Sequence, residues 1–463
     1  MQTNELTKKH KLIFLVLIAL LMFKPAPGIL FGAFSVKIIP IIILLISFVV
    51  LLIMTKDWLL KSPNNLYYLD KKPDYVTIFL SLGALSLIIS TVYGIIALPK
   101  AGLGDFIELY RYAFYISFYL IAREVKVPSI KQLFFPIFLF ILAIEIFGIL
   151  QFFNIFNINN HIGLLYTQSE SLYKMIDHQH RVTSTFQNPN MYGSFLIIVV
   201  ALVLSYMTIY KTNPIIVYGF ITLSLLSVFF TTSRTAVIIT AGVIVYWLLL
   251  RLVLRKGTFI KSLSQGLIVL GIFAMLALVV IPKVPYLDYA ADQIISGLSA
   301  NAPSEGGEDS EGEDGDNSNS EEDDERLKRS VESVSSFKNR YYYWNLNLEK
   351  FKESPIIGSG PMKEGFVRFA DNSYLYTLAR YGVLGLLVLA GMYLYIYART
   401  FYSILKENKS KQFLGLAINL TIVGYAVMGM VAEVWYNLQS ITVLFIIIGL
   451  MFNKFISDEE ESI

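Results

Sequence analysis

Long apolar stretches separated by short polar segments dominate the pattern of this 463-residue chain. Each stretch is roughly 17–25 residues long, the length that an α-helix needs to cross the hydrocarbon of a bilayer. We place twelve such spans, near 12–33, 38–54, 75–97, 105–122, 132–154, 191–210, 214–230, 235–250, 264–282, 372–398, 412–433 and 439–456. The pattern therefore predicts an all-α, polytopic integral membrane protein.

The first predicted span has two unusual features. Residues 24–28 (Lys-Pro-Ala-Pro-Gly) interrupt it, so we expect its outer end to be broken or re-entrant. Lysines precede its apolar run, as in a signal peptide, but no A-x-A-type cleavage site follows and further spans come after it. We therefore interpret it as an uncleaved first helix.

Basic residues predict which way the chain crosses the membrane. They gather before the first span and after the even-numbered spans, as Lys8, Lys9, Lys11, Lys56, Lys61, Lys71, Lys72, Arg123, Lys126, Lys131, Lys211, Arg251, Arg255, Lys256, Lys261, Arg399, Lys406, Lys409 and Lys411. The short loops on the other side hold little beyond Lys37, Lys100 and Arg234. By the positive-inside bias, both termini are expected in the cytoplasm.

Two of the predicted outer loops are long, at 155–190 and 283–371. The second, between spans 9 and 10, is too long for a connector and is expected to act as a lid or binding element. Its segment 305–325 has twelve acidic and no basic residues, so we expect a disordered, solvated spacer. The chain thus divides into 1–282 with spans 1–9, the loop 283–371, and 372–463 with spans 10–12 and a cytoplasmic tail.

The composition agrees with an integral membrane protein and argues against several other kinds of function. Hydrophobic residues make up 55% and charged residues 16% of the chain, and the net charge of +3 is too small to indicate nucleic-acid binding. The absence of cysteine excludes disulfides and thiol catalysis. No P-loop is present, and His178 and His180 lack a third ligand at metal-site spacing.

Chemistry is therefore expected from arginines and carboxylates at the outer side. Arg234 stands in a turn between two apolar segments, where it could anchor a lipid headgroup or serve a function. Arg181 precedes a turn in which Asn188 and Asn190 flank a proline, and helix capping would equally explain these asparagines.

The large loop adds further candidates near its end. Arg340 and the aromatic residues Tyr343 and Trp344 suit oxyanion binding and sugar stacking, and equally an interfacial aromatic belt. Asp371 starts a span, where an ordinary N-cap is the default interpretation.

Acidic residues also fall inside the predicted spans. Asp105, Glu108 and Arg111 recur every three residues and are expected to satisfy one another. Glu145 and Glu433 have no nearby partner in sequence. They indicate proton or substrate handling, or pairing with an arginine elsewhere.

Taken in order, four blocks resemble the Wzy polymerase and O-antigen ligase family of bacterial polysaccharide assembly. They are Arg181 through Phe186 to Asn190; residues 232–236 with Arg234; Arg340 and Trp344 leading to 355–360 (PIIGSG); and 372–375 (NSYL) leading to 382–385 (GVLG). The resemblance covers roughly residues 180–390. Each block alone is weak, and the ordered set with its large outer loop is more specific.

The resemblance implies a glycosyltransferase of the inner (cytoplasmic) membrane, which uses an undecaprenyl-diphosphate-linked glycan at the outer face of that membrane. It implies no metal or nucleotide cofactor. It assigns Arg181, Arg234 and Arg340 to donor diphosphate binding, with Asn190, Asn372, Tyr343 and Trp344 as further substrate-binding candidates.

Ligases of this family place a histidine before the asparagine of the last block, and this chain has Asp371 there. This departure favours a polymerase of O-antigen, capsular or exopolysaccharide repeat units. It leaves Asp371 as the first candidate for the base and Glu433 as the second. Arg380 stands where relatives often have an acidic residue, and its role stays open.

Other functions stay open at this point. A lipid-linked oligosaccharide flippase would suit twelve spans with intramembrane charges, but it needs no large outer loop. An O-antigen ligase, a peptidoglycan polymerase of the shape–elongation–division type and an interaction scaffold are further alternatives. A chain-length regulator and a flippase are the protein partners that the resemblance implies, and the bilayer is the other.

Overall fold

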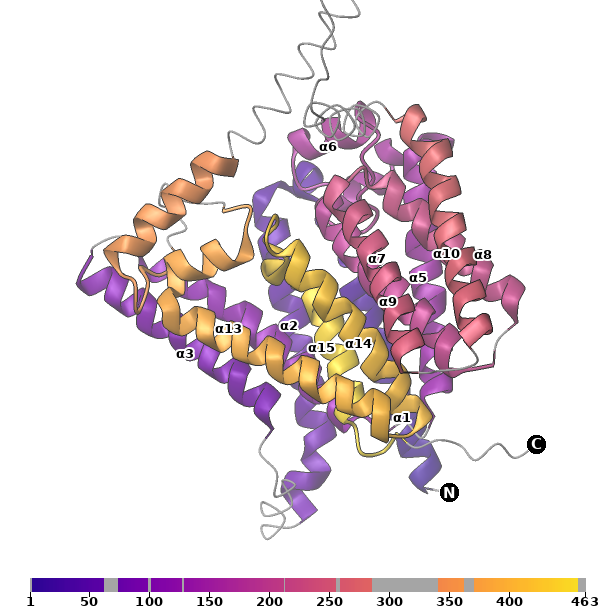
Figure 1. The fold of residues 1–463 in the computed structure, drawn as a ribbon. Coiled ribbons are helices and arrows are strands. Elements are labelled where there is room, and N and C mark those ends of the chain that lie inside the picture. The colour runs from indigo at the N-terminus through magenta and orange to yellow at the C-terminus, as the bar shows by residue number, and fades with distance from the viewer. Residues whose placement is uncertain are drawn as a thin grey trace, which may run out of the picture.

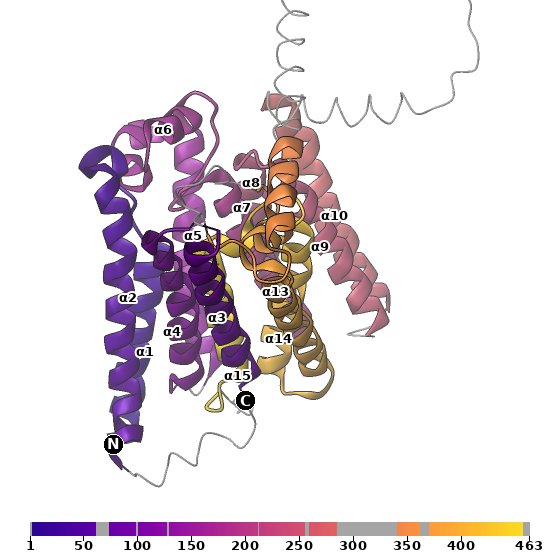
Figure 2. The same cartoon turned by 90° about the vertical axis from the view of Figure 1, so that its left-hand side faces the viewer.

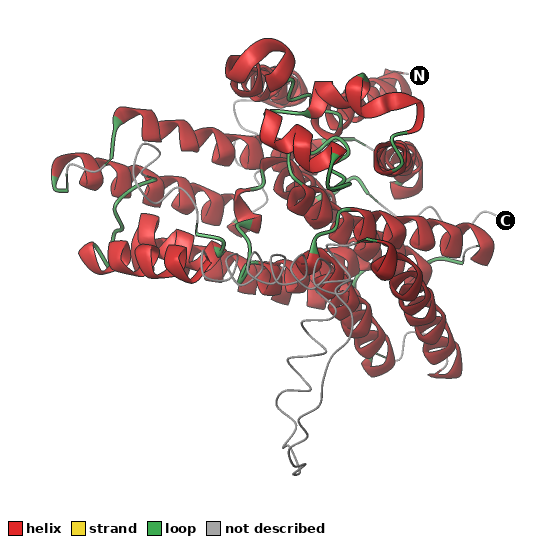
Figure 3. Ribbon diagram, turned by 90° about the horizontal axis from the view of Figure 1, so that it is seen from above, coloured by secondary structure: helices red, strands yellow, loops and turns green. Residues whose placement is uncertain are grey.

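The computed structural model describes residues 2–61, 74–98, 101–126, 129–211, 213–254, 259–284, 340–361 and 370–456. Within these ranges the regular structure is helical and contains no strand, as Figure 3 also shows. The all-α class predicted from the sequence is therefore confirmed. The predicted acidic spacer at 305–325 lies outside the described residues.

The long helices pack side by side in one bundle, and their axes are tilted relative to one another, with α3 and α13 oblique to α8, α9 and α10 (Figure 1). They are α1 (Gln2–Met22), α2 (Gly28–Lys61), α3 (Tyr75–Ile96), α4 (Leu109–Glu124), α5 (Ile130–Phe152), α7 (Pro189–Ile209), α8 (Pro214–Phe230), α9 (Arg234–Val253), α10 (Phe259–Val280), α13 (Ser373–Lys406), α14 (Lys409–Met428) and α15 (Leu438–Phe452). Short helices η2 (Leu103–Glu108), η3 (Ile155–Asn160), η4 (Ile162–Tyr166), α6 (Glu170–Asp177), η5 (Ile281–Lys283) and η6 (Val434–Tyr436) join them. Residues 340–353 form another helix.

Eight of the described helices are long and apolar enough to cross a membrane. They are Gly28–Met54, Tyr75–Ile96, Ile130–Phe152, Pro189–Ile209, Arg234–Val253, Phe259–Lys283, Ser373–Lys406 and Lys409–Met428, and two shorter apolar helices are Pro214–Phe230 and Leu438–Phe452. This is consistent with the expected polytopic membrane protein. Twelve spans and their orientation stay predictions.

The helical structure is interrupted at the two prolines Pro25 and Pro27. The helix α1 ends at Met22 and α2 begins at Gly28, so the predicted bounds of the first span, 12–33, are wrong. Proline has no N–H for a helical hydrogen bond and clashes with the preceding turn. The interruption expected at 24–28 is therefore the end of the first helix, and the predicted second span, 38–54, is the interior of α2.

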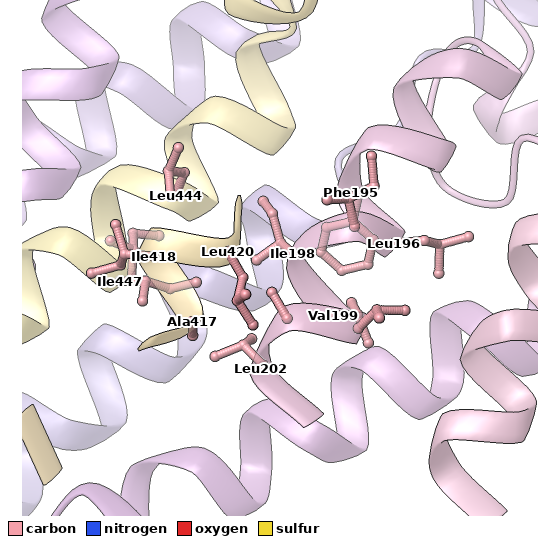
Figure 4. Close-up of a cluster of buried hydrophobic side chains, with 14 of the residues drawn as sticks. Phe195, Leu196, Ile198, Val199, Leu202, Ala417, Ile418, Leu420, Leu444 and Ile447 are labelled. Carbon is pink, nitrogen blue, oxygen red and sulfur yellow. The ribbon is translucent and has the colours of Figure 1, made fainter. Parts of the chain in front are cut away.

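The core forms around α7, which is apolar on all sides. Of its most apolar stretch 83% is buried, against 22% for the stretch that contains α10. Figure 4 shows side chains of α7 packed against others from α14 and α15; the labelled residues include Phe195, Leu196 and Leu202 of α7, Ala417 and Leu420 of α14, and Leu444 of α15. A helix that is hydrophobic all round is stable only where protein or lipid covers it. The outer helices therefore present their exposed apolar side chains to lipid.

The short helix α6 lies at one end of the bundle, which we call the α6 face, and α1 begins at the opposite end (Figures 1 and 2). Among the long helices that start at the α6 face are α7, α9, α13 and α15 (Figure 1). The segments that precede them carry the residues considered next.

Candidate functional site

Arg181 reaches the turn that joins α8 to α9. Its Nε donates a hydrogen bond of 3.0 Å to Oγ1 of Thr232, and the next residue, Val182, donates its N–H to the carbonyl of Phe230. Arg234 is the first residue of α9, two positions after Thr232. The tight turn predicted around Arg234 is therefore present, and the structure places Arg181 against it.

The backbone at this site is strained. Thr232 has φ 53°, and His180 and Ser184, in the segment around Arg181, both have φ 48°. Asp371, before α13, has φ 45°. Non-glycine residues rarely adopt this conformation, which is least favourable for a β-branched residue such as threonine. Such strain gathers at functional sites, where the surrounding fold holds it in place.

The segment after Arg181 enters the bundle and is held by other helices. Ser184 donates its hydroxyl to the carbonyl of Ile144 at 2.7 Å and its N–H to Oε1 of Gln151, both on α5. Thr185 donates its hydroxyl to the carbonyl of Met22, the last residue of α1. These bonds hold the segment that follows Arg181 against α5 and the end of α1.

The start of α7 connects this turn to the loop between α14 and α15. A Cβ on Gly193 would lie 2.6 Å from Cβ of Ala236, so α7 and α9 meet closely only because glycine is present. Asn437 donates its side-chain amide to Oγ of Ser194 at 2.9 Å and to the carbonyl of Met191. Contacts through the start of α7 therefore connect the Arg234 turn to Asn437, at the start of α15.

A second group of candidate residues meets at the start of α13. Arg340 Nε lies 3.8 Å from Oδ2 of Asp371. Oε1 of Glu433, in the loop after α14, accepts the backbone N–H of Asp371 and that of Ala370. The structure thus brings Arg340, Asp371 and Glu433 together although they are far apart in sequence.

Asn372, and not Asp371, caps α13. Its Oδ1 accepts the N–H groups of Tyr374 and Leu375, and its Nδ2 donates to the carbonyl of Met430 at 2.8 Å. The default interpretation of Asp371 as an N-cap is wrong, because the helix begins one residue later. The Asp371 carboxylate is consequently left for Arg340, whereas the Asn372 amide serves the fold.

The environment changes the acidity of both carboxyl groups. Burial raises the pKa of Asp371, and the positive charge of Arg340 opposes that shift. Burial also raises the pKa of Glu433, against the hydrogen bond from the N–H of Ala370. A carboxylate with a raised pKa is a stronger base than an ordinary one.

The segment 355–361 is joined to a kink in α13. Gly382 has φ 64° inside that helix, and Gly358 has φ 82° opposite it. Val383 and Leu384 donate their N–H groups to the carbonyls of Pro355 and Ile356, at 2.8 and 3.2 Å. The glycines of the PIIGSG and GVLG blocks therefore serve a close backbone contact.

Arg380, whose role the sequence left open, holds the same region together. It is 2% exposed and donates from Nε to the carbonyl of Pro361 and from Nη1 to Oδ1 of Asn347. Its guanidinium lies 3.4 Å from the ring centroid of Tyr376, one helical turn earlier. Arg380 thus ties the 340–353 helix to α13, and the four-residue spacing from Tyr376 is the only signal of this in the sequence.

The remaining candidate residues lie outside the two groups described above, the Arg181–Thr232 pair and the Arg340–Asp371–Glu433 group. Asn190 is exposed and donates its N–H to the side chain of Asn188, which is the residue that caps α7. Tyr343 and Trp344 are partly buried on the 340–353 helix. Arg111 forms the expected ion pair with Glu108 at 2.7 Å, while Asp105 accepts the N–H of Gly102.

Glu145 lies in α5 and is fully buried. Its carboxyl oxygens have no hydrogen-bond or ion-pair partner in the described part of the chain, so the arginine partner considered from the sequence is not found there. Within the same ranges, no group of three or more histidine and acidic residues could hold a metal ion.

The chain is thus a polytopic helical membrane protein whose α6 face carries arginines and carboxylates from distant segments. A family model described as O-antigen ligase matches residues 219–390, which include the Arg234 turn, Arg340 and the start of α13. The match supports the O-antigen ligase and polymerase family, whose members handle lipid-linked glycans, and a part in polysaccharide assembly. Arg181, Asn190 and Glu433 lie outside the matched residues. No curated protein is similar enough to the chain to count as a match.

Proposed function

We propose that this protein polymerises oligosaccharide repeat units carried on undecaprenyl diphosphate, at the outer face of the cytoplasmic membrane. The terminal hydroxyl of an acceptor unit attacks the anomeric carbon of the growing chain and loses its proton to a carboxylate. The bond from that carbon to the diphosphate breaks, and undecaprenyl diphosphate leaves with the bonding electrons. The observation that carries the proposal is the meeting of Arg340, Asp371 and Glu433 at the start of α13.

Donor binding falls to Arg181, Arg234 and Arg340. Guanidinium groups match phosphate oxygens in bidentate geometry and can stabilise the charge of a leaving diphosphate without a metal. Arg234 opens α9. A cation is disfavoured at the positive end of a helix dipole, whereas an anion is stabilised there. An anionic ligand beside Arg234 would therefore be favoured by both the side chain and the helix.

Asp371 is the residue we assign as base. It does not cap α13, it is partly exposed, and its pKa is raised by burial. The positive charge of Arg340 beside it favours the ionised carboxylate, and binding of a diphosphate to Arg340 would release Asp371 toward the acceptor hydroxyl. Glu433 remains the second candidate, but its Oε1 already holds two backbone N–H groups, which suits a positioning role.

Polymerase and ligase differ in the acceptor, which is a lipid-linked repeat unit for the first and the lipid A core for the second. The replacement of the ligase histidine by Asp371 favours the polymerase in our proposal. Asn190, Asn372, Tyr343 and Trp344 are the further substrate-binding candidates. Capsular and exopolysaccharide units are alternatives to O-antigen as substrate.

Gene deletion followed by complementation tests the proposal. Wild-type protein should restore long surface glycan, whereas Arg234→Ala and Asp371→Asn should leave single repeat units on the lipid carrier at the outer face. Lys174→Ala and Asp177→Asn, both on α6, are matched controls at the same face and should restore the polymer.

Two other results would overturn the polymerase assignment. Full-length polymer that accumulates on undecaprenyl diphosphate without transfer to the lipid A core would identify a ligase. Repeat units that stay on the cytoplasmic side would identify a flippase.

A further inference from the structure

Glu145 is a fully buried carboxyl group that the proposed reaction does not use. It lies inside α5, one of the helices long and apolar enough to cross a membrane, and it is 0% exposed. Neither of its carboxyl oxygens has a hydrogen-bond partner among the described residues, and no basic side chain of those residues is in electrostatic contact with it. An ionised carboxylate without a counter-charge is very costly to bury, so Glu145 must be neutralised in another way.

Hydroxyl groups from α7 and α8 lie near the Glu145 side chain. Ser224 of α8 lies beside the carboxyl group, and Tyr192 of α7 is in electrostatic contact with it. Ser227, one turn after Ser224, lies beside the Tyr192 hydroxyl. All three residues are buried, and within the described ranges none of the three hydroxyls has a partner in hydrogen-bond geometry. Four polar side chains therefore share one small part of an apolar core.

Aromatic rings separate this group from the α6 face. Phe152 of α5 and Phe230 of α8 stack with their ring centroids 3.9 Å apart and an angle of 6° between the ring planes. They lie about two helical turns beyond Glu145 and Ser224, toward the α6 face. A glycan or a diphosphate at that face would therefore not contact Glu145, and any action of Glu145 on a substrate must pass through other residues.

The same side of α5 contacts the residue that follows Arg181. Gly148 comes one turn after Glu145, and a Cβ on it would lie 3.0 Å from Oη of Tyr192 and 3.3 Å from Cγ1 of Val182. Both distances are shorter than an ordinary van der Waals contact, so glycine gives these two side chains the room to approach the helix. The Tyr192 hydroxyl is thus adjacent both to Glu145 and to the segment that carries Arg181.

Hydrogen bonds attach that segment to the same helix. Ser184 donates its hydroxyl to the carbonyl of Ile144, the residue before Glu145, and its N–H to Oε1 of Gln151. Ser184 has φ 48°, a conformation that persists only where the surrounding contacts hold it. Contacts therefore continue without interruption from Glu145 to the segment that begins at Arg181.

We propose that Glu145 is held in its protonated, neutral form and that it positions Arg181 through Tyr192 and residues 182–184. A protonated carboxyl group has an O–H to donate and a carbonyl oxygen to accept, whereas a carboxylate can only accept. It can therefore serve the hydroxyls of Tyr192 and Ser224 together without a buried charge. The inference rests on the proposed function and deepens it, because Arg181 is one of the donor-binding residues there. Glu145 is a positioning residue, since it does not touch the substrate.

Infrared spectroscopy tests the protonation state without any measurement of activity. The purified full-length protein, in vesicles of phosphatidylethanolamine at neutral pH, should show the carbonyl stretch of a protonated carboxylic acid that is missing from Glu145→Gln. Asp177→Asn on α6 is the control and should retain that band. Loss of a carboxylate band in Glu145→Gln would show that Glu145 is charged, and a band that changes when Na⁺ is replaced by choline would identify a cation site. Either result overturns the proposal.

Three substitutions test the positioning role. Glu145→Gln is neutral and retains a donor and an acceptor, so the KM for the lipid-linked donor should stay close to the wild-type value. Glu145→Leu removes both and should raise that KM about tenfold, with kcat changed less. Tyr192→Phe removes one hydroxyl and should raise the KM in the same direction, while Tyr206→Phe, toward the other end of α7, is its control. If Glu145→Leu does not fold, Tyr192→Phe decides the test.

A double substitution tests whether the effect passes through Arg181. Arg181→Met should itself raise the KM for the donor, and adding Glu145→Leu should then raise it little further, because coupled residues do not contribute independently. Effects that multiply would show that Glu145 acts on binding by some other route, and they would overturn the positioning role. Thermal unfolding of each variant shows whether the fold is retained.

The outcomes separate this inference from the proposed function. If the wild-type protein polymerises lipid-linked units but Glu145→Leu and Tyr192→Phe both leave the KM unchanged, the positioning role fails and the polymerase stands. If the wild-type protein forms no polymer, the proposed function fails, whereas the infrared spectra still decide whether Glu145 is protonated.

Discussion

The Glu433 carboxylate accepts the backbone N–H of Asp371 at 3.3 Å, and these residues are 62 positions apart in the sequence. The same oxygen accepts the N–H of Ala370. Glu433 thereby fixes the backbone from which the Asp371 side chain extends. The loop after α14 and the start of α13 are held as one unit by this contact and by the amide of Asn372.

The contact predicts different effects for two substitutions of Glu433. Glu433→Gln retains an oxygen that can accept both N–H groups, so polymer formation should stay near the wild-type level. Glu433→Ala leaves both donors without their acceptor and should destabilise the protein by about 1–3 kcal/mol, with loss of polymer. Thermal unfolding and glycan chain length are the measurements. A stable Glu433→Gln protein without activity would instead make Glu433 the base.

Asp371→Asn should lower the polymerisation rate about 10²–10⁴-fold, the usual contribution of a general base, while the fold is retained. The asparagine side chain cannot take up the proton of the attacking hydroxyl, but it has nearly the same size as the aspartate side chain. The rate would be measured with purified protein and lipid-linked units, and Asp177→Asn is the control. A rate within about twofold of wild type would exclude Asp371 as the base.

The pH dependence of the rate should reveal the pair of Asp371 and Arg340. The base works when ionised, so the rate should rise as pH passes upward through the pKa of Asp371, which burial raises. Arg340 opposes that rise, so Arg340→Met should raise the pKa further and move the acid limb to higher pH. Arg340→Lys keeps a positive charge and should move it less. An unmoved limb in the methionine variant would mean that another group titrates.

Gly382→Ala should destabilise the protein by more than about 2 kcal/mol, as expected for a steric conflict in a left-handed backbone. Gly382 has φ 64°, and a Cβ there would lie 2.2 Å from the carbonyl oxygen of Ile356. Gly271→Ala on α10 is the control, because no atom lies within 4 Å of its added Cβ. Thermal unfolding in detergent compares them, and equal melting temperatures would contradict the tight contact between α13 and the 355–361 turn.

Thr232→Val should weaken donor binding about tenfold, because it removes the oxygen that accepts a hydrogen bond from Arg181. Thr232→Ser retains that oxygen and should bind normally. Thr222→Val is the control, since the Thr222 hydroxyl only donates to a carbonyl within α8. The KM for the lipid-linked donor is the measurement. Equal KM values for the valine and serine variants would show that the Thr232 hydroxyl does not position Arg181.

The helical class could be derived from the sequence because lipid leaves the backbone few alternatives. A chain in hydrocarbon must satisfy its N–H and C=O groups locally, so apolar runs of about 20 residues predict helices almost independently of their neighbours. The break at Pro25 and Pro27 follows from local chemistry as well. Arg181, Arg234 and Arg340 stood out as candidates because charge is rare beside such runs.

Contacts between distant segments could not be derived in this way. Whether Asp371 or Asn372 caps α13 depended on where the helix begins, and the loop after α14 supports that start. Arg380 was assigned no role until its partners Asn347 and Pro361 were seen beside it. Sequence alone determined which segments are helices, because backbone hydrogen bonding in lipid is local. Only the tertiary structure decided which polar groups meet, because those contacts arise from side-chain packing between segments far apart in the chain.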